Sequence, residues 1–432
     1  MLSRQSTYYL RVMKFDEFGL DEGILEALSY MGFEKATPIQ EMALPIIMGG
    51  KDLIASAQTG TGKTAAFILP VMNNAIHNDH SGTHTLVVVP TRELAIQIDQ
   101  QIQGFAYFTH VESIAIYGGG GGMDFDQEKK ALTTGAPIIV ATPGKLISHL
   151  NMGYVKFGTV QTLILDEADR MLDIGFYDDI MKIASFLPKE RQTLMFSATM
   201  PPKIVQLSNK ILSNPERISI AMSKPAEGVL QAAYLVYDRD KIALTRKLIA
   251  DKPNYKSILV FSSTKKMVGE IVRELRRHRM NVEGISSNLE QKERESVLSR
   301  FRSRQTRVLV ATDVISRGID IKDINLVINF NVPGDAEDYV HRIGRTARAE
   351  TTGVALTFVN EEDMYKFDRI EKLIEKEVVK APLPKEIGEG PEWNPKKRFD
   401  NRRGGGGFKG SKGGRGGGSR PQSKGRSNHR RR

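Results

Sequence analysis

Short apolar runs alternate with segments of helical periodicity along most of this 432-residue chain. In the first half, the apolar runs cover residues 53–55, 85–89, 113–117, 138–141, 162–165 and 193–196. A second set covers residues 232–236, 257–261, 307–311, 326–329 and 354–359. Apolar runs of this length, separated by helical segments, are typical of strands buried on both faces of a parallel sheet. The pattern therefore predicts two α/β domains with helices on both faces of each sheet.

A polar stretch containing proline and glycine separates the two halves. Residues 222–228 read Met-Ser-Lys-Pro-Ala-Glu-Gly, and we interpret them as an interdomain linker. The first domain then spans residues 13–221 and the second spans residues 229–384. Residues 1–12 form an N-terminal extension, and Met13 is an alternative start of the chain.

The excess positive charge is concentrated at the C-terminal end. The formal net charge is +11, yet residues 395–432 alone hold 14 basic residues and one acidic residue, Asp400. The remaining 394 residues hold 48 basic and 50 acidic residues. Because residues 395–432 are rich in glycine and arginine and almost lack apolar side chains, we expect residues 385–432 to form a disordered basic tail. Such a tail attracts polyanions such as nucleic acid.

Composition excludes several classes of protein. The chain contains no cysteine, so disulfides and thiolate metal sites are excluded. No apolar run reaches the length of a membrane-spanning helix, and the first residues lack the apolar stretch of a signal peptide. We therefore expect a soluble, cytoplasmic protein.

A glycine-rich segment follows the first apolar run. Residues 57–64 read Ala-Gln-Thr-Gly-Thr-Gly-Lys-Thr and lead into an apolar helical segment. A strand, a glycine loop and a helix in this order cradle phosphates, because loop N–H groups and the positive end of the helix attract anions. The spacing predicts that Lys63 binds the β- and γ-phosphates and that the Thr64 hydroxyl binds Mg²⁺. The residues expected to surround the phosphates are Ala57, Gln58, Thr59, Gly60, Thr61, Gly62, Lys63 and Thr64.

Two carboxylates directly follow the apolar run that ends at Leu165. Asp166 is expected to hold the metal ion through its water shell, and Glu167 to orient and deprotonate the attacking water. Together with Lys63, this pair predicts a site that hydrolyses a nucleoside triphosphate.

From about residue 13 to residue 380, the motifs resemble those of the DEAD-box ATP-dependent RNA helicases in order and spacing. The tetrapeptide Asp-Glu-Ala-Asp at residues 166–169 and the segment Gly-Phe-Glu-Lys-Ala-Thr-Pro-Ile-Gln at residues 32–40 carry much of this resemblance. It implies two RecA-like domains in tandem, with ATP and Mg²⁺ as ligands. It also implies that Gln40 reads adenine, that Phe15 stacks on the base, and that Gly318 and Asp320 contact the nucleotide.

The resemblance further implies that RNA is bound through its backbone, which makes recognition tolerant of sequence. The residues implied are Pro90, Thr91, Arg92, Gly118, Gly119, Thr142, Pro143, Gly144, Arg294 and Thr312. The five-glycine run 118–122 is longer than the family needs, and we interpret residues 120–122 as a flexible turn. Lys145 stands where the family commonly has arginine, and residues 285–289 depart from the usual pattern, so no RNA contact is assigned there.

Further residues are implied to link the nucleotide state to the rest of the protein. Asp169, Ser197 and Thr199 form the coupling group, and His341 joins hydrogen bonds between the domains. Arg345 and Arg348 are three residues apart, on one helical face, and would reach the γ-phosphate from the second domain.

These observations predict an ATP-dependent RNA helicase that couples RNA-stimulated ATP hydrolysis to local, non-processive unwinding of short duplexes or to remodelling of RNA–protein complexes. The alternatives are an ATP-gated RNA clamp with little turnover and a processive DNA translocase. The tail would tether RNA, and the glycine-arginine tail together with the compact body most resembles bacterial enzymes of the RhlE-like group. Ribosome-assembly or RNA-decay proteins are the expected partners.

Overall fold

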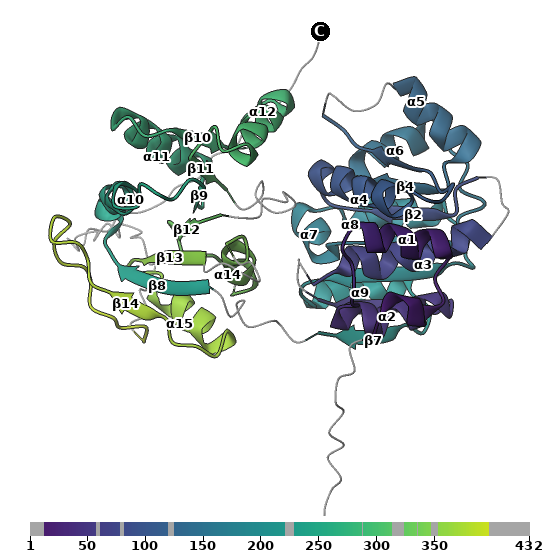
Figure 1. The fold of residues 1–432 in the computed structure, drawn as a ribbon, viewed down its shortest axis with the longest axis horizontal. Coiled ribbons are helices and arrows are strands. Elements are labelled where there is room, and N and C mark those ends of the chain that lie inside the picture. The colour runs from purple at the N-terminus through teal and green to yellow at the C-terminus, as the bar shows by residue number, and fades with distance from the viewer. Residues whose placement is uncertain are drawn as a thin grey trace, which may run out of the picture. The chain divides into compact units, whose positions relative to one another are not determined.

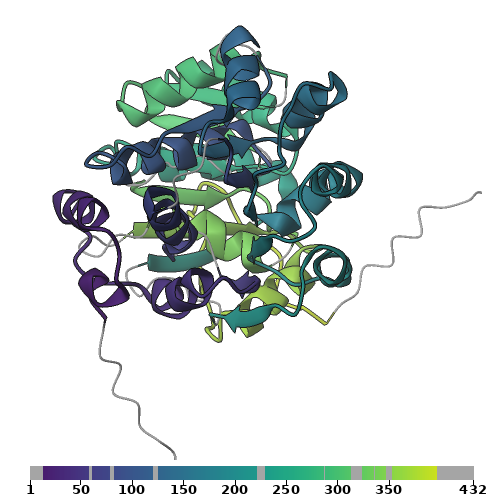
Figure 2. The ribbon, with the colours of Figure 1, turned by 90° about the vertical axis from the view of Figure 1, so that its right-hand side faces the viewer.

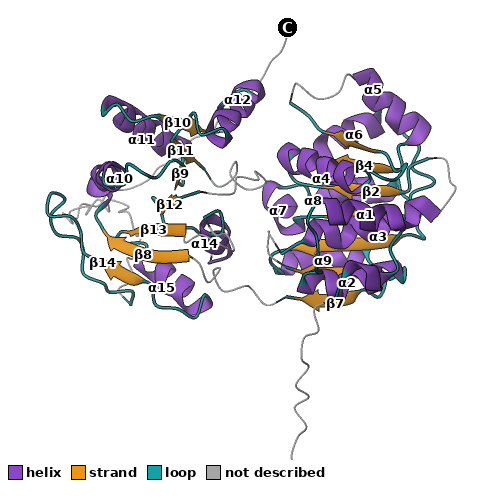
Figure 3. Ribbon diagram, in the orientation of Figure 1, coloured by secondary structure: helices purple, strands orange, loops and turns teal. Residues whose placement is uncertain are grey.

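The computed structural model describes residues 13–57, 61–77, 82–119, 125–220, 229–286, 288–312, 324–334, 336–346 and 353–396. The expected extension 1–12, the expected linker 222–228 and most of the expected tail lie outside these residues. Helices alternate with strands in both halves of the chain (Figure 3). None of the helices described is both long enough and apolar enough to cross a bilayer.

The first domain is built on a seven-stranded sheet (Figure 1). Its strands are β1 (Leu53–Ser56), β2 (Thr85–Val88), β3 (Ser113–Ile116), β4 (Ile138–Ala141), β5 (Thr162–Leu165), β6 (Gln192–Ser197) and β7 (Glu216–Ser219). Its α-helices are α1 (Glu22–Tyr30), α2 (Pro38–Met48), α3 (Lys63–His77), α4 (Arg92–Phe105), α5 (Phe125–Lys130), α6 (Pro143–Asn151), α7 (Ala168–Ile174), α8 (Tyr177–Ser185) and α9 (Pro202–Ile211). A 3₁₀ turn, η1 (Phe15–Phe18), and a π-helical turn, η2 (Ala131–Gly135), complete it.

The second domain has a sheet of the same size. Its strands are β8 (Val229–Leu235), β9 (Ile258–Phe261), β10 (Val282–Ile285), β11 (Val308–Ala311), β12 (Leu326–Asn329), β13 (Gly353–Val359) and β14 (Val379–Ala381). Its helices are η3 (Asp238–Asp240), α10 (Lys241–Ala250), α11 (Lys265–Arg277), α12 (Gln291–Arg302), α14 (Ala336–Ile343) and α15 (Met364–Leu373).

The two sheets have equivalent strand orders. The first runs β3-β4-β2-β5-β6-β1-β7 and the second runs β10-β11-β9-β12-β13-β8-β14. Every strand pair in both sheets is parallel. The predicted fold class, two parallel α/β sheets in tandem, is therefore confirmed.

The alternation of side chains along each strand divides the core of the first domain into two layers. Leu86 and Val88 of β2 pack into one layer, whereas Val87 packs into the other. Helices α1 to α4 cover the face that includes Val87, and α6 to α9 cover the opposite face (Figures 1 and 2). Each fully buried aliphatic side chain contributes about 1.5–3 kcal/mol to the stability of the fold. These layers therefore stabilise the strands whose ends carry the loops of the site.

The described second domain continues past the boundary expected at residue 384. Trp393 packs edge-on against Phe367 of α15, with ring centroids 6.2 Å apart. The backbone N–H of Asn394 donates to the Met364 sulfur at 3.2 Å, and Ile387 packs against the domain core. The packing of the second domain therefore extends to at least Asn394, because Ile387 and Trp393 cover its core beyond the expected end.

Candidate nucleotide and RNA site

Three neighbouring strands of the first domain lead, at their carboxyl ends, to the glycine-rich loop, the acid pair and the coupling residues of the sequence analysis. Strand β1 leads to the glycine-rich loop, β5 leads to Asp166 and Glu167, and β6 ends at Ser197. In the sheet these strands lie in the order β5-β6-β1. Loops at the carboxyl edge of a parallel sheet are where α/β folds bind their ligands.

Lys63 and Asp166 form the buried centre of this group. The Lys63 Nζ lies 3.8 Å from Asp166 Oδ1, and both side chains are almost fully buried. Burial raises the pKa of the Asp166 carboxyl to about 6, although the Lys63 charge opposes the shift. A buried carboxylate of this kind gains stability from a nearby cation, so Asp166 is chemically suited to the expected Mg²⁺. Thr64 lies partly buried in the first turn of α3, next to Lys63.

Glu167 adopts an uncommon backbone conformation. Its φ of 51° and ψ of 48° lie in the left-handed region, which costs free energy for a residue with a side chain. The Glu167 N–H donates to Asp166 Oδ1 at 2.9 Å, and its carboxylate accepts from the Arg170 guanidinium at 3.0 Å. The two adjacent acids thus have different partners, Lys63 for Asp166 and Arg170 for Glu167. Arg170, which our sequence analysis missed, restrains Glu167; an arginine one helical turn after the acid pair was the available signal.

Asp169, Ser197 and Thr199 are brought together although 30 residues separate Asp169 from Thr199. Asp169 Oδ2 accepts from the N–H of Ala198 at 3.1 Å, and from the N–H and hydroxyl of Thr199 at 2.8 and 2.9 Å. The Asp169 N–H in turn lies 3.3 Å from the Ser197 hydroxyl. One carboxylate therefore ties the loop after β5 to the loop after β6.

Gln40 is buried and contacts the glycine-rich loop directly. Its Nε2 donates to the Gly62 carbonyl at 3.0 Å, and its Oε1 accepts from the Thr37 N–H at 2.8 Å. An amide has two N–H groups and two oxygen lone pairs, so one of each is left for a ligand. Phe15 is buried in the core beside Phe18 and Phe33, with ring centroids 6.4 Å away from each.

The RNA-contacting residues expected in the first domain lie at the other half of the same sheet edge. Pro90, Gly118 and Thr142 begin the loops after β2, β3 and β4, which are neighbours in the order β3-β4-β2. Thr91 caps α4 by accepting from the Leu94 N–H at 3.4 Å. Pro143 and Gly144 open α6.

Arg92 connects two of the loops that are expected to contact RNA. Its guanidinium donates to the Gly119 carbonyl at 3.0 Å and lies 4.7 Å from the ring centroid of Tyr117. The side chain is 8% exposed, so the arginine is buried and supports the Gly119 loop.

The second domain repeats this arrangement. Thr312 follows β11, which lies beside β9 and β10 in the sheet, and Arg294 is partly buried on α12. His341 lies on α14, and Arg345 follows that helix. Arg342, a residue that sequence reasoning passed over, is buried and donates to the side chain of Asn329 at 3.2 Å and to the carbonyl of Asn331 at 3.0 Å. Arg342 thus attaches the arginine-rich segment to β12.

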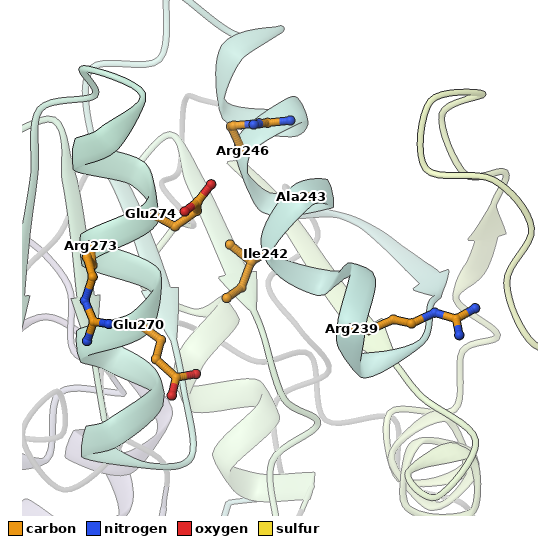
Figure 4. Close-up of a pocket in the computed structure, with 7 residues that line it drawn as sticks. All are labelled: Arg239, Ile242, Ala243, Arg246, Glu270, Arg273 and Glu274. Carbon is orange, nitrogen blue, oxygen red and sulfur yellow. The ribbon is translucent and has the colours of Figure 1, made fainter.

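Six predicted nucleotide residues lie outside the described part of the chain, namely Gln58, Thr59, Gly60, Gly318, Asp320 and Arg348. A surface hollow between α10 and α11 is lined by residues that the sequence analysis assigned to no site. Figure 4 shows Ile242 of α10 and Glu274 of α11 pointing toward each other across it.

Two family models match the chain. Residues 37–207 match the DEAD/DEAH box helicase model, and residues 240–350 match the helicase conserved C-terminal domain.

Among curated proteins, the chain is 42% identical over 373 residues to the ATP-dependent RNA helicase CshA of Listeria monocytogenes, covering 86% of this chain and 71% of that protein. It is 39% identical over 382 residues to the DEAD-box ATP-dependent RNA helicase CshA of Bacillus subtilis, covering 88% of this chain and 76% of that protein. These relatives do not support the expected RhlE-like subgroup, because they carry the name CshA.

Two solved structures are also similar to the chain. S. cerevisiae Dbp5 bound to RNA and ADP BeF3 superposes with a TM-score of 0.77 at 30% identity, covering 85% of this chain and 95% of that one. Mss116p bound to single-stranded RNA and AMP-PNP gives a TM-score of 0.75 at 27% identity, covering 88% of this chain and 81% of that one.

Proposed function

The chain belongs to the DEAD-box ATP-dependent RNA helicases, and we propose how its residues divide the work of RNA-stimulated ATP hydrolysis. Lys63 and the loop N–H groups bind the phosphates, and Glu167 takes the proton of the attacking water. Thr64 and Asp166 are the residues that would hold Mg²⁺, which would neutralise phosphate charge. The buried Lys63–Asp166 pair, at 3.8 Å, supports this division.

Gln40 is the residue that recognises adenine. Its remaining N–H and lone pair match the acceptor and donor on the adenine edge, and guanine presents the opposite pattern there. Because Gln40 also holds the Gly62 carbonyl, base recognition and the phosphate loop share one side chain. Phe15 packs against Phe18 and Phe33, and its stacking on the base stays a prediction.

Arg345 and Arg348 supply positive charge for the transition state from the second domain. The loops after β2, β3 and β4, together with Arg294 and Thr312, contact the backbone of the RNA. We propose that RNA and ATP together favour a closed form in which these arginines meet the phosphates, so that RNA activates hydrolysis by shifting an equilibrium. Closure then disrupts pairing locally, without processive movement. A cytoplasmic setting, and ribosome-assembly or RNA-decay proteins as partners, remain predictions.

The single observation that supports the proposal most is the shared sheet edge, with β5-β6-β1 carrying the nucleotide residues and β3-β4-β2 carrying the RNA residues. The test is steady-state ATPase activity with and without single-stranded RNA, together with strand release from a short duplex. Strong stimulation by RNA and ATP-dependent strand release are expected. RNA-independent turnover would contradict the proposal, and negligible turnover with tight ATP-dependent RNA binding would instead support the clamp. Equal activation by single-stranded DNA would favour the translocase.

A further inference from the structure

Helices α5 and α6 lie side by side in the first domain and are joined through one buried carboxylate (Figure 1). The Glu128 side chain of α5 is only 1% exposed. Its Oε2 accepts from the Lys145 ammonium at 2.8 Å and lies 3.1 Å from His149 Nε2. Lys145 and His149 are four residues apart on α6, so both reach Glu128 from one helical face. None of these three residues belongs to the nucleotide or RNA sets above.

The hydrogen bonds of this cluster fit a neutral His149. Burial lowers the pKa of His149, although the Glu128 carboxylate opposes the shift. Burial also raises the pKa of the Tyr154 hydroxyl, which therefore keeps its proton. Tyr154 O–H then donates to His149 Nδ1, and His149 Nε2–H donates to Glu128. Glu128 is thus held by a cation on one side and a neutral donor on the other, which makes its burial tolerable.

The cluster also fixes α5 after the glycine run. The Phe125 ring stacks on the His149 ring at 5.3 Å with an interplanar angle of 14°, and Lys129 lies 5.4 Å from the Tyr154 ring centroid. The contacts of Glu128 and Phe125 therefore hold α5 against α6.

Lys145 occupies the first turn of α6, directly after Gly144. A cation there is unfavourable, because the N-terminal end of a helix carries partial positive charge. Glu128 offsets this cost and keeps the ammonium beside the turn that contains Thr142, Pro143 and Gly144.

We propose that Glu128 is a positioning residue for RNA binding. It acts through Lys145 to hold the first turn of α6, which contains Pro143 and Gly144, and through His149 to hold the rest of that helix against α5. This inference rests on the proposed RNA role of the Thr142–Gly144 turn.

The test is a double-mutant cycle with E128Q, K145M and the double variant, measured in the full chain. E128Q keeps the shape of the side chain and removes its charge, and K145M keeps the aliphatic stem of the half-buried lysine. D126N is the matched control, because Asp126 is an exposed carboxylate on the same helix. The readouts are the RNA concentration for half-maximal ATPase stimulation, the RNA-saturated kcat and the Kd for ATP without RNA.

E128Q should raise the half-maximal RNA concentration about fivefold, in line with a coupling of the usual size between sites. Its kcat and ATP Kd should stay within about twofold of the parent. General destabilisation would not change the RNA requirement alone and leave these two values unchanged. The double variant should be no worse than the poorer single variant, because the two residues act as a unit. Additive effects, an E128Q value equal to that of D126N, or tighter RNA binding in E128Q would each overturn the proposal. Failure of RNA to stimulate the unmodified protein would instead refute the proposed function.

Discussion

Replacing Gln40 with alanine tests whether adenine recognition and the phosphate loop share this side chain. The substitution removes the 3.0 Å bond to the Gly62 carbonyl and the 2.8 Å bond from the Thr37 N–H. The Gly62 carbonyl keeps a second bond, from the Ala66 N–H at 3.2 Å, so it is not left unsatisfied. The loss at the loop should therefore be one net hydrogen bond, about 1 kcal/mol.

That loss corresponds to about a fivefold weaker binding of any ligand held by the loop through its phosphates. A second contact of similar size is lost only with adenine, so ATP should bind about thirtyfold more weakly in Q40A. Discrimination against GTP should fall accordingly. Q40E should retain the bond from Thr37 but place a second acceptor against the Gly62 carbonyl, so its binding of ATP should be weaker still.

The assay is titration calorimetry with tripolyphosphate, ATP and GTP on the parent, Q40A and Q40E. Gln103 is exposed on α4, and Q103A serves as the control for loss of a glutamine amide. Unchanged tripolyphosphate affinity in Q40A would show that the Gly62 contact does not organise the loop. An unchanged preference for ATP over GTP would show that adenine is read elsewhere.

Three further predictions concern chemistry, RNA capture and stability. E167Q should bind ATP and RNA together but hydrolyse ATP on the order of 10²–10⁴ times more slowly, because the water loses its base; single-turnover kinetics would detect a near-normal rate that removes Glu167 from this role. Deletion of residues 397–432 spares Trp393 and removes 13 of the 14 basic residues of the tail, so kcat should hold while RNA affinity and its salt dependence fall; equal slopes of log K against log salt would exclude a tether. Asp52 accepts from the N–H groups of Thr193 at 2.7 Å and Ser213 at 2.6 Å, so D52N should cost about 1–3 kcal/mol of unfolding free energy; an unchanged melting temperature would contradict that accounting.

Local pattern in the sequence was enough to predict the central strands and the motifs that follow them. The apolar runs at residues 138–141, 162–165 and 326–329 coincide with β4, β5 and β12. Such runs are readable because a strand covered on both faces has few places for polar residues. The loops after these strands could also be predicted, because a phosphate-binding loop is made of consecutive residues and so forms a motif in the sequence.

Three strands escaped prediction, and all three are edge strands. β7, β10 and β14 each lie at the end of a sheet. In β7 only Ile218 is fully buried, and no residue of β14 is. An edge strand is partly open to solvent, so its apolar pattern is weak and its pairing depends on the neighbour already present. The structured segment beyond residue 384 was missed for a similar reason. Ile387 and Trp393 are isolated apolar residues, and only the core that they cover shows that they are packed.

The sequence by itself determined which segments become buried strands and which loops carry phosphate, acid and arginine chemistry. Only the tertiary structure decided that β5, β6 and β1 are neighbours, and that β3, β4 and β2 form the other half of the edge. Buried strands share one periodicity, so their order is set by packing and by right-handed crossovers. The contacts of Asp169 with Thr199, of Gln40 with Gly62 and of Glu128 with Lys145 follow from that order. No local pattern encodes them, because each pair meets only after the helices have packed on the sheet.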